Sequence, residues 1–299
     1  MTLDIGLIGY GEVGKIFTSA FKAKTGRWVG AWDLKFANAA TRNAELAHAA
    51  KAGIQACDSA AALCSKADLI IGAVTASNTT SVAQEVARAI RSGTFYLDFN
   101  SASPGTKQQC AALIDAAGGH YVEAGVMNSV PPYGIKVPML LGGAHAQRLA
   151  DLLNPLGTDA KPVSEKIGVA SAIKMCRSVM IKGLEALVME SFATARAYGV
   201  EEHMIATLYE TYPGIDWNEQ GAYLMSRVVM HGRRRSEEMW EAANTVREAG
   251  FEPLMASATA AKQAWVAEQK QAGVFDGLAK DVPWQDYADR LLQHSLKKK

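Results

Sequence analysis

The sequence predicts an α/β domain built on a doubly wound parallel sheet, followed by an all-helical domain. Short apolar runs alternate with helical patterns up to Val163, an alternation typical of parallel strands joined by crossover helices. After Val163 only helical patterns remain, and the first of them, 165–200, is long enough to connect both parts. We therefore predict a dinucleotide-binding domain at 1–164 and a helical domain for substrate binding and dimerisation at 165–299.

The first apolar run, 5–9, breaks into glycines and continues as an amphipathic helix. Gly9, Gly11 and Gly14 have GxGxxG spacing in this strand, turn and helix. The first glycine permits the turn, the second lets a pyrophosphate approach the backbone, and the third lets the helix pack closely on the strand. The free N–H groups of the helix then hold the phosphates. These features predict a Rossmann NAD(P) site at Gly9, Tyr10, Gly11, Glu12, Val13 and Gly14.

The second strand, 28–32, should end at Asp33. This residue fits the acidic position that binds the adenosine ribose, where a carboxylate accepts from the 2′-hydroxyl and repels a 2′-phosphate. Asp33 therefore favours NAD as the cofactor. Lys35 and Arg42 could instead hold the 2′-phosphate of NADP, and Asp33 could also be a plain helix N-cap.

Further strands are expected at 68–74, 94–99, 121–123, 137–141 and 159–163, with helices at 79–90, 107–117 and 147–153. Ligands of such sheets bind beyond the carboxyl ends of the strands, which here are the loops 75–78, 100–105 and 125–133. Thr75 is a candidate for the cofactor, and Asn100 and Ser101 are candidates for the substrate. Ser103, directly before Pro104, is more typical of a helix cap.

The helical pattern from about 168 to 198 would span roughly 45 Å at ~1.5 Å per residue. Most of its circumference is apolar, which predicts a buried helix. Its polar residues recur at steps of three and four and form one stripe, and they are Ser171, Lys174, Ser178, Lys182 and Glu185. An unpaired buried ammonium is costly, so Lys174 is the catalytic candidate. The alternative is that the stripe faces water.

Five more helices are expected at 201–211, 218–231, 234–249, 254–271 and 283–296, with a break at Gly232. A basic cluster, His231 and Arg233–Arg235, could hold an anionic group. Its neighbours Glu237, Glu238 and Glu241 favour an exposed ion-pair network instead. The aromatic residues near Pro213 are interpreted as core, and they are Tyr209, Tyr212, Trp217 and Tyr223.

The composition limits the classes of partner. The 31 basic and 30 acidic side chains leave a net charge of +1, which argues against nucleic-acid and membrane binding. The four cysteines lack metal-ligand spacing, so we expect no metal site and reduced thiols in a cytoplasmic protein. The buried linking helix and the apolar helical half predict a homodimer.

Five segments occur in order along the chain: GLIGYGEVG, DFNSASPG, EAGVMNS, MLLGG and GVASAIK. In these segments the chain resembles the β-hydroxyacid dehydrogenase family, which includes 3-hydroxyisobutyrate dehydrogenase and the N-terminal part of 6-phosphogluconate dehydrogenase. The C-terminal third, with MHGRRRSEEM, looks more like a poorly characterised branch of phosphogluconate-dehydrogenase-like proteins. Some members of this branch resemble L-threonate dehydrogenase.

This resemblance implies an NAD(P)-dependent oxidation of a 3-hydroxy acid or sugar acid. Lys174 matches the family's lysine, which takes the hydroxyl proton while hydride goes to the nicotinamide. Ser178 stands where the family usually has asparagine, Ala170 where it has glycine, and Asn100 where it has serine. We expect Asn100, Ser101 and Ser178 to hold the polar groups of a hydroxy acid that differs from the family's usual small substrates.

Three other functions fit the same sequence. An imine reductase could use this fold and cofactor, although the retained Lys174 argues against it. A regulatory protein could bind the dinucleotide without catalysis. A decarboxylating dehydrogenase would release carbon dioxide during oxidation.

Overall fold

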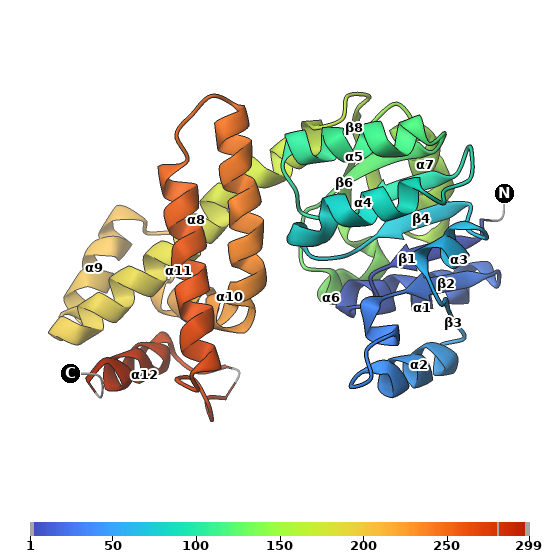
Figure 1. Ribbon diagram of the computed structural model, residues 1–299. Coiled ribbons are helices and arrows are strands. Elements are labelled where there is room, and N and C mark those ends of the chain that lie inside the picture. The colour runs from blue at the N-terminus through green and yellow to red at the C-terminus, as the bar shows by residue number, and fades with distance from the viewer. Residues whose placement is uncertain (1–2, 280, 297–299) are drawn as a thin grey trace. The chain divides into compact units, whose positions relative to one another are not determined.

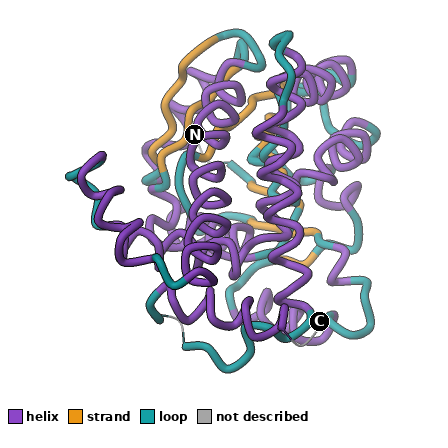
Figure 2. The backbone as a smooth tube through the Cα atoms, turned by 90° about the vertical axis from the view of Figure 1, so that its left-hand side faces the viewer, coloured by secondary structure: helices purple, strands orange, loops and turns teal. Residues whose placement is uncertain are grey.

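The computed structural model describes residues 3–279 and 281–296. The chain divides into two compact units, Met1–Met175 and Cys176–Lys299. Within these described residues, the strands belong to the first unit and the second unit contains helices and loops (Figure 1). Figure 2 shows the helices and strands in separate colours. The division falls inside the long helix α8, Val169–Tyr198, whereas we expected a boundary at 164/165, just before it. Lys174 therefore belongs to the α/β unit.

The α/β unit contains one eight-stranded sheet with the order β3-β2-β1-β4-β5-β6-β7-β8. The expected strands are present, and the short β3 is an addition that has no clear pattern in the sequence. Their bounds are β1 Ile5–Ile8, β2 Val29–Trp32, β3 Gln55–Ala56, β4 Leu69–Gly72, β5 Phe95–Asp98, β6 His120–Val126, β7 Pro138–Gly142 and β8 Asp159–Ser164. The order of the strands reverses between β1 and β4, the point where such sheets bind ligands.

All neighbouring strands are parallel except β6 and β7, which are antiparallel. The link between these two strands holds only the short helix α6, Val130–Tyr133, and one 3-10 turn. Parallel neighbours need a long crossover connection, usually a helix, whereas a short link can join two antiparallel strands. The prediction of a parallel sheet is therefore confirmed for β1 to β6, whereas β7 and β8 run parallel to each other and opposite to the rest.

Helices cover both faces of the sheet, as the doubly wound prediction requires. Phe17 and Phe21 of α1 and Leu149 of α7 pack on one face. Leu63 of α3, Val82 of α4 and Ile114 of α5 pack on the other. The helix bounds are α1 Glu12–Thr25, α2 Arg42–Lys51, α3 Ala60–Cys64, α4 Thr79–Ala87, α5 Pro104–Ala116 and α7 Ala146–Leu153.

The helical unit contains the rest of α8 together with α9 Glu201–Thr211, α10 Trp217–Glu248, α11 Leu254–Gln271 and α12 Trp284–Leu296. The expected break at Gly232 is wrong, because α10 continues through it. A Cβ on Gly232 would lie 2.7 Å from the carbonyl oxygen of Gln263 on α11. The glycine therefore permits close packing of two helices. None of the described helices is both long and apolar enough to cross a membrane.

From Ser178 onward the polar stripe of α8 is buried within the helical unit, so the alternative that the stripe faces water is wrong for this part of the helix. Lys182 is 7% exposed and Glu185 is 1% exposed. Lys182 Nζ lies 2.7 Å from a carboxylate oxygen of Glu238 on α10. Arg235 of α10 donates to Glu185 at 2.6 Å. Large apolar side chains of α8 are exposed instead, and they are Ile173, Met180, Ile181, Leu184 and Leu187.

In the basic cluster of α10, Arg233 and Arg234 are exposed as expected, whereas Arg235 is buried. Arg235 is buried against Glu185, while Arg234 reaches Glu238 at 3.9 Å. Burial, together with the charges of nearby arginines, lowers the pKa of His231 to about 4. Of the four aromatic residues interpreted as core, only Trp217 is buried, because Tyr209, Tyr212 and Tyr223 are exposed.

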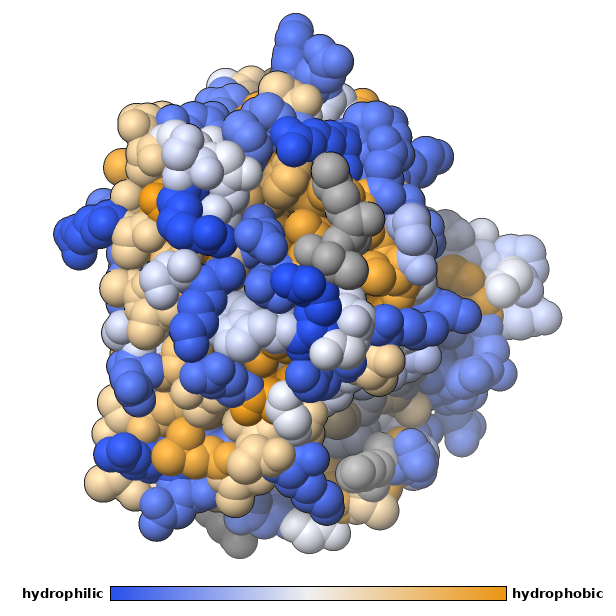
Figure 3. All heavy atoms as spheres, turned by 90° about the vertical axis from the view of Figure 1, so that its right-hand side faces the viewer, coloured by the Kyte–Doolittle hydropathy of each residue, from blue (hydrophilic) through white to orange (hydrophobic). Residues whose placement is uncertain are grey.

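The surface shown in Figure 3 intermixes hydrophilic and hydrophobic side chains. This mixture fits the nearly balanced charge of the sequence. Exposed large apolar side chains are concentrated elsewhere: 16 of the 19 among the described residues lie in the helical unit, from Met180 onward.

Candidate active site

The glycine-rich turn after β1 has the geometry that a dinucleotide site needs. Gly9 has a φ of 103°, and a Cβ there would collide with the carbonyl oxygen of Ala73 after β4. A Cβ on Gly14 would collide with the carbonyl oxygen of Gly9. A Cβ on Gly11 would meet nothing within 4 Å. Gly9 and Gly14 therefore allow the turn to close, and Gly11 leaves its backbone open to an approaching pyrophosphate.

The residues between these glycines differ in their surroundings. Glu12 is exposed in the first turn of α1, and Val13 packs partly on the core. Tyr10 is fully buried, with its hydroxyl 3.0 Å from His48 Nδ1 on α2. The Tyr10 side chain thus ties the turn to α2, and only its backbone remains for the cofactor site that we predicted.

Asp33 connects the end of β2 to the glycine-rich turn. One carboxylate oxygen accepts from Tyr10 N at 2.6 Å, and the other accepts from Lys35 N at 2.8 Å. The second bond caps a 3-10 helix, Leu34–Phe36, so the simple capping role that we considered is present. Each carboxylate oxygen keeps further acceptor capacity. The ribose role of Asp33 therefore stays a prediction that this geometry permits.

The ends of β4 and β5 are joined through Asn100. Its side-chain oxygen accepts from Val74 N at 2.7 Å, and the residue is buried. Thr75, the next residue after Val74, is exposed, and its hydroxyl accepts from Asn78 Nδ2 at 2.9 Å. Asn100 thus braces two loops at the carboxyl edge of the sheet. Its contact with the substrate stays a prediction.

A buried charged group holds Asn100 and the loop after β5. Asp98 accepts from Asn100 N at 2.9 Å and from the Tyr121 hydroxyl at 2.7 Å. Lys107 Nζ lies 3.1 Å from the same carboxylate, and both residues are almost fully buried. Burial raises the pKa of Tyr121 well above its ordinary value, so its hydroxyl remains a donor. This network fixes where the next residue, Ser101, projects.

Lys174 and Ser101 meet at this edge of the sheet. Lys174 Nζ donates to Ser101 Oγ at 2.7 Å, and Lys174 is half-buried. An amine and a hydroxyl at hydrogen-bond distance can together bind a substrate oxygen and move a proton. The structure thus brings together two of the predicted site residues that are 73 positions apart in the sequence.

Sequence reasoning missed Glu123, which binds the start of α8. Its carboxylate accepts from the backbone N–H groups of Gly168, Ala170 and Ser171 at 2.7, 3.1 and 3.2 Å. Glu123 is fully buried on β6. A single acidic residue inside an otherwise apolar strand is the signal that could have identified it, because a buried carboxylate requires partners.

Ser178 lies in the helical unit, four residues after Lys174 on α8. It is buried, and its hydroxyl accepts from Lys182 Nζ at 3.2 Å. Its role in substrate binding stays a prediction. Within the described residues, no group of histidine, cysteine and acidic side chains could hold a metal ion.

Comparison with known proteins agrees with this geometry. A family model described as the NAD binding domain of 6-phosphogluconate dehydrogenase matches residues 4–157, more than half of the chain. The chain belongs to this family. Its first unit is therefore an NAD(P)-binding domain. A second model, a domain of unknown function named DUF1932, matches residues 195–266 in the helical unit.

Full-length relatives have been solved or described without an assigned activity. A conserved hypothetical protein from Sinorhizobium meliloti 1021 is 35% identical, with a TM-score of 0.76 over 98% of this chain and 97% of that one. An uncharacterized 28.5 kDa protein from Methanothermus fervidus is 27% identical over 86% of this chain and 96% of its own length. The 3-hydroxyisobutyrate dehydrogenase of Mycobacterium tuberculosis shares the fold, at 18% identity and a TM-score of 0.68 over 97% of this chain and 99% of that one.

Proposed function

We propose that this protein is an NAD(P)-dependent oxidoreductase that transfers hydride between the nicotinamide and a hydroxy acid. The observation that carries the proposal is the 2.7 Å contact between Lys174 Nζ and Ser101 Oγ. This contact lies at the carboxyl edge of a sheet whose glycine-rich turn is built for a pyrophosphate. A proton-transfer group and a dinucleotide site on one edge are the two parts that a dehydrogenase needs.

NAD is the cofactor that we favour. The Gly11 backbone is open, and the Asp33 carboxylate lies beside the turn, bound to Tyr10 N. A carboxylate here accepts from a ribose hydroxyl and repels a 2′-phosphate. When bound, the nicotinamide accepts or donates the hydride. The chain's own residues have to bind the two reactants and handle the proton.

Lys174 is the general acid and base in this proposal. In the oxidative direction its neutral amine takes the proton of the substrate hydroxyl, and in the reverse direction its ammonium returns that proton. Desolvation favours the neutral form of a lysine amine. Ser101 donates to or accepts from the polar groups of the substrate. Asn100 and Ser178 are proposed to complete the binding of a sugar acid or another 3-hydroxy acid.

The test is a panel of hydroxy acids, semialdehydes and cyclic imines with NAD(H) and NADP(H), followed by nicotinamide absorbance. We expect turnover of at least one hydroxy acid or semialdehyde. Turnover of imines alone would identify an imine reductase. Tight dinucleotide binding without any turnover would identify a regulatory protein. Carbon dioxide released in step with oxidation would identify a decarboxylating dehydrogenase.

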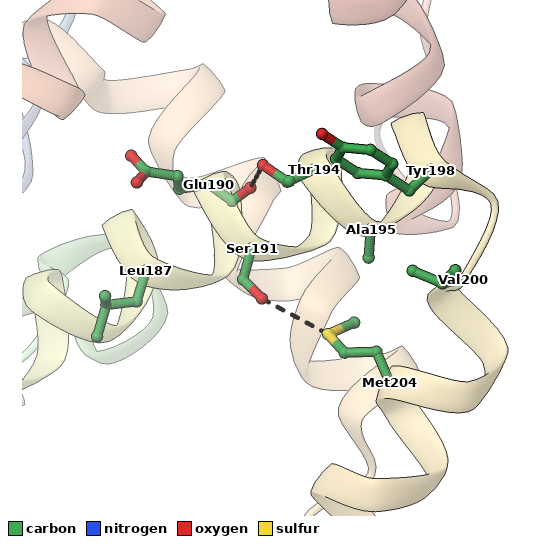
Figure 4. Close-up of a pocket in the computed structure, with 8 residues that line it drawn as sticks. All are labelled: Leu187, Glu190, Ser191, Thr194, Ala195, Tyr198, Val200 and Met204. Carbon is green, nitrogen blue, oxygen red and sulfur yellow. Dashed lines mark hydrogen bonds between the residues drawn. The ribbon is translucent and has the colours of Figure 1, made fainter.

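We also propose that the protein is a homodimer associated through its helical unit. Met180 is 74% exposed and Leu187 is 55% exposed on α8, while Ser178, Lys182 and Glu185 of the same helix are buried. Water-facing apolar side chains on a helix with a polar interior indicate a surface that a partner covers. Leu187 also lines an apolar groove of about 390 Å³ with Ala195, Val200 and Met204 of α8 and α9 (Figure 4).

The oligomeric state is tested by light scattering on the eluted protein. The double variant Met180→Glu, Leu187→Glu should elute as a monomer, because two charges cannot be buried unpaired at an apolar interface. Phe251→Glu is the control, because this equally apolar and 73% exposed residue follows α10 rather than lying on α8. A wild-type monomer at all concentrations would contradict the proposal.

A further inference from the structure

Three backbone N–H groups at the start of α8 converge on one side chain of the sheet. The first N–H groups of a helix have no partner within the helix and need an outside acceptor. Here Glu123 Oε1 accepts from Gly168 and Ala170, and Oε2 accepts from Ser171. A carboxylate at this end of a helix also stabilises it through the macrodipole. The start of α8 is therefore fixed to β6 at a buried point.

Two glycines make room for this attachment. A Cβ on Gly142, opposite Glu123 on β7, would lie 2.5 Å from Glu123 Oε1. A Cβ on Gly125 would lie 2.9 Å from the carbonyl oxygen of Ala170 and 3.6 Å from the Cβ of Lys174. The absence of these two side chains lets the carboxylate fit and lets α8 approach the strand beside Lys174.

Glu123 and Gly125 are two residues apart on β6 and face the same side of the sheet, roughly 7 Å from one another along the strand. An added Cβ on Gly125 would contact the Cβ of Lys174, so Lys174 packs on the same face of β6 as the Glu123 carboxylate that holds α8. From Ser171 to Lys174 the helix rises by only about 4.5 Å. A shift of the first residues of α8 therefore moves Lys174 by nearly the same distance.

We propose that Glu123 is the positioning residue for Lys174, holding the start of α8 so that the amine reaches Ser101. The effect of Glu123 on catalysis rests on the proposed function of Lys174, whereas its effect on the position of Lys174 does not. Glu123 does not touch the substrate. It acts on the place of the lysine by holding the backbone N–H groups at the start of α8.

The experiment is trace labelling of lysines with acetic anhydride, read peptide by peptide by mass spectrometry, in the wild type and in Glu123→Gln. The glutamine keeps the shape, but it loses the charge and turns an N–H donor toward backbone donors. We expect Lys174 to react about three to ten times faster in the variant, because the hydrogen bond to Ser101 no longer holds the amine.

The labelling of Lys51, an exposed lysine at the end of α2, gives an internal reference. Glu185→Gln is the matched variant, since Glu185 is an equally buried carboxylate that pairs with Arg235 in the helical unit. We expect Glu185→Gln to leave the labelling of Lys174 unchanged. An unchanged Lys174 rate in folded Glu123→Gln would overturn the positioning role.

A second measurement on the wild type covers the case in which Glu123→Gln does not fold. Hydrogen exchange should show the amides of Gly168, Ala170 and Ser171 to be at least a hundredfold slower than the first-turn amides of α9, which has no side-chain cap. Equal exchange rates would refute the attachment. With an active substrate, Glu123→Gln should lower kcat without changing the dissociation constant of the dinucleotide.

The two proposals fail in distinguishable ways. Full activity of a Lys174→Ala variant removes the catalytic role of the lysine but leaves the effect of Glu123 on its labelling. An unchanged labelling rate in Glu123→Gln removes the positioning role and leaves the catalytic one.

Discussion

Lys174 Nζ donates a hydrogen bond to Ser101 Oγ at 2.7 Å. The serine follows β5 and the lysine lies near the start of α8, so two elements that are distant in the sequence meet at the carboxyl edge of the sheet. The pair is the centre of the proposed active site.

Replacement of Lys174 by alanine removes the proposed acid and base. We expect kcat to fall by about 10² to 10⁴ on any substrate that the panel identifies, because positioned proton transfer contributes that much. The dissociation constant of the dinucleotide, measured by fluorescence titration, should stay within about twofold. Turnover close to that of the wild type would exclude this lysine from catalysis.

Ser101 and Ser103 form a matched pair of serines with different roles. Ser101→Ala should lower kcat/KM by about ten- to 150-fold, because a hydrogen bond to a charged group contributes roughly 1.5 to 3 kcal/mol. Ser103 Oγ accepts from Thr106 N and caps α5. Ser103→Ala should therefore lower the free energy of unfolding by about 1 kcal/mol and leave kcat/KM nearly unchanged. Steady-state rates and urea unfolding distinguish the two variants. An equal loss of kcat/KM in Ser101→Ala and Ser103→Ala would argue against a specific role for Ser101.

Asp33→Asn tests the preference for NAD. The amide keeps an acceptor for Tyr10 N but loses the charge that favours a ribose hydroxyl. We expect NADH binding to weaken about tenfold and NADPH binding to weaken less or to improve, as measured by fluorescence titration. Glu85→Gln is the control, because Glu85 is an exposed carboxylate on α4. Tighter binding of NADPH than of NADH by the wild type would contradict the assignment.

Gly232 and Gly183 provide a test of helix packing. Gly232→Ala should lower the free energy of unfolding by about 1 to 3 kcal/mol, because its methyl group would lie 2.7 Å from the Gln263 carbonyl oxygen. At Gly183 the nearest atom to an added Cβ is Thr259 Oγ1 at 3.9 Å. Gly183→Ala should be neutral or stabilising by up to about 1 kcal/mol, because alanine favours the helix. Urea unfolding of both variants checks the contrast, and a stable Gly232→Ala would show that α10 and α11 can separate at little cost.

His231 should make stability depend on pH. Burial and the nearby cations lower its pKa to about 4 in the folded protein, from an ordinary value of 6.5. The unfolded state therefore binds the proton more readily, so the stabilisation is complete above about pH 6.5 and is lost as the pH falls toward 4. His231→Asn should flatten the dependence of the urea midpoint between these values. His203→Asn, at an exposed position on α9, should not flatten it.

Much of the fold could be predicted from the sequence because local patterns carry it. The turn from Gly9 to Gly14 follows from backbone sterics within a few residues, and the strand periodicity of the first half predicts the doubly wound sheet. The bounds of α9 and α11 also agree with the expected ranges. The prediction of a helix break at Gly232 was wrong, because this position is a glycine to make room for the Gln263 carbonyl oxygen on α11, thirty-one residues later in the chain.

The sequence by itself determined the α/β and helical halves, the glycine-rich turn and the choice of Lys174 as a candidate, because each is encoded in contiguous residues. Only the tertiary structure decided that Lys174 meets Ser101, that Glu123 holds the helix start, and that the polar stripe of α8 is buried while its apolar side is exposed. The physical reason is that burial and partners depend on long-range packing. A lysine, a glutamate or a leucine on a helix has the same local pattern whether it faces water or another helix.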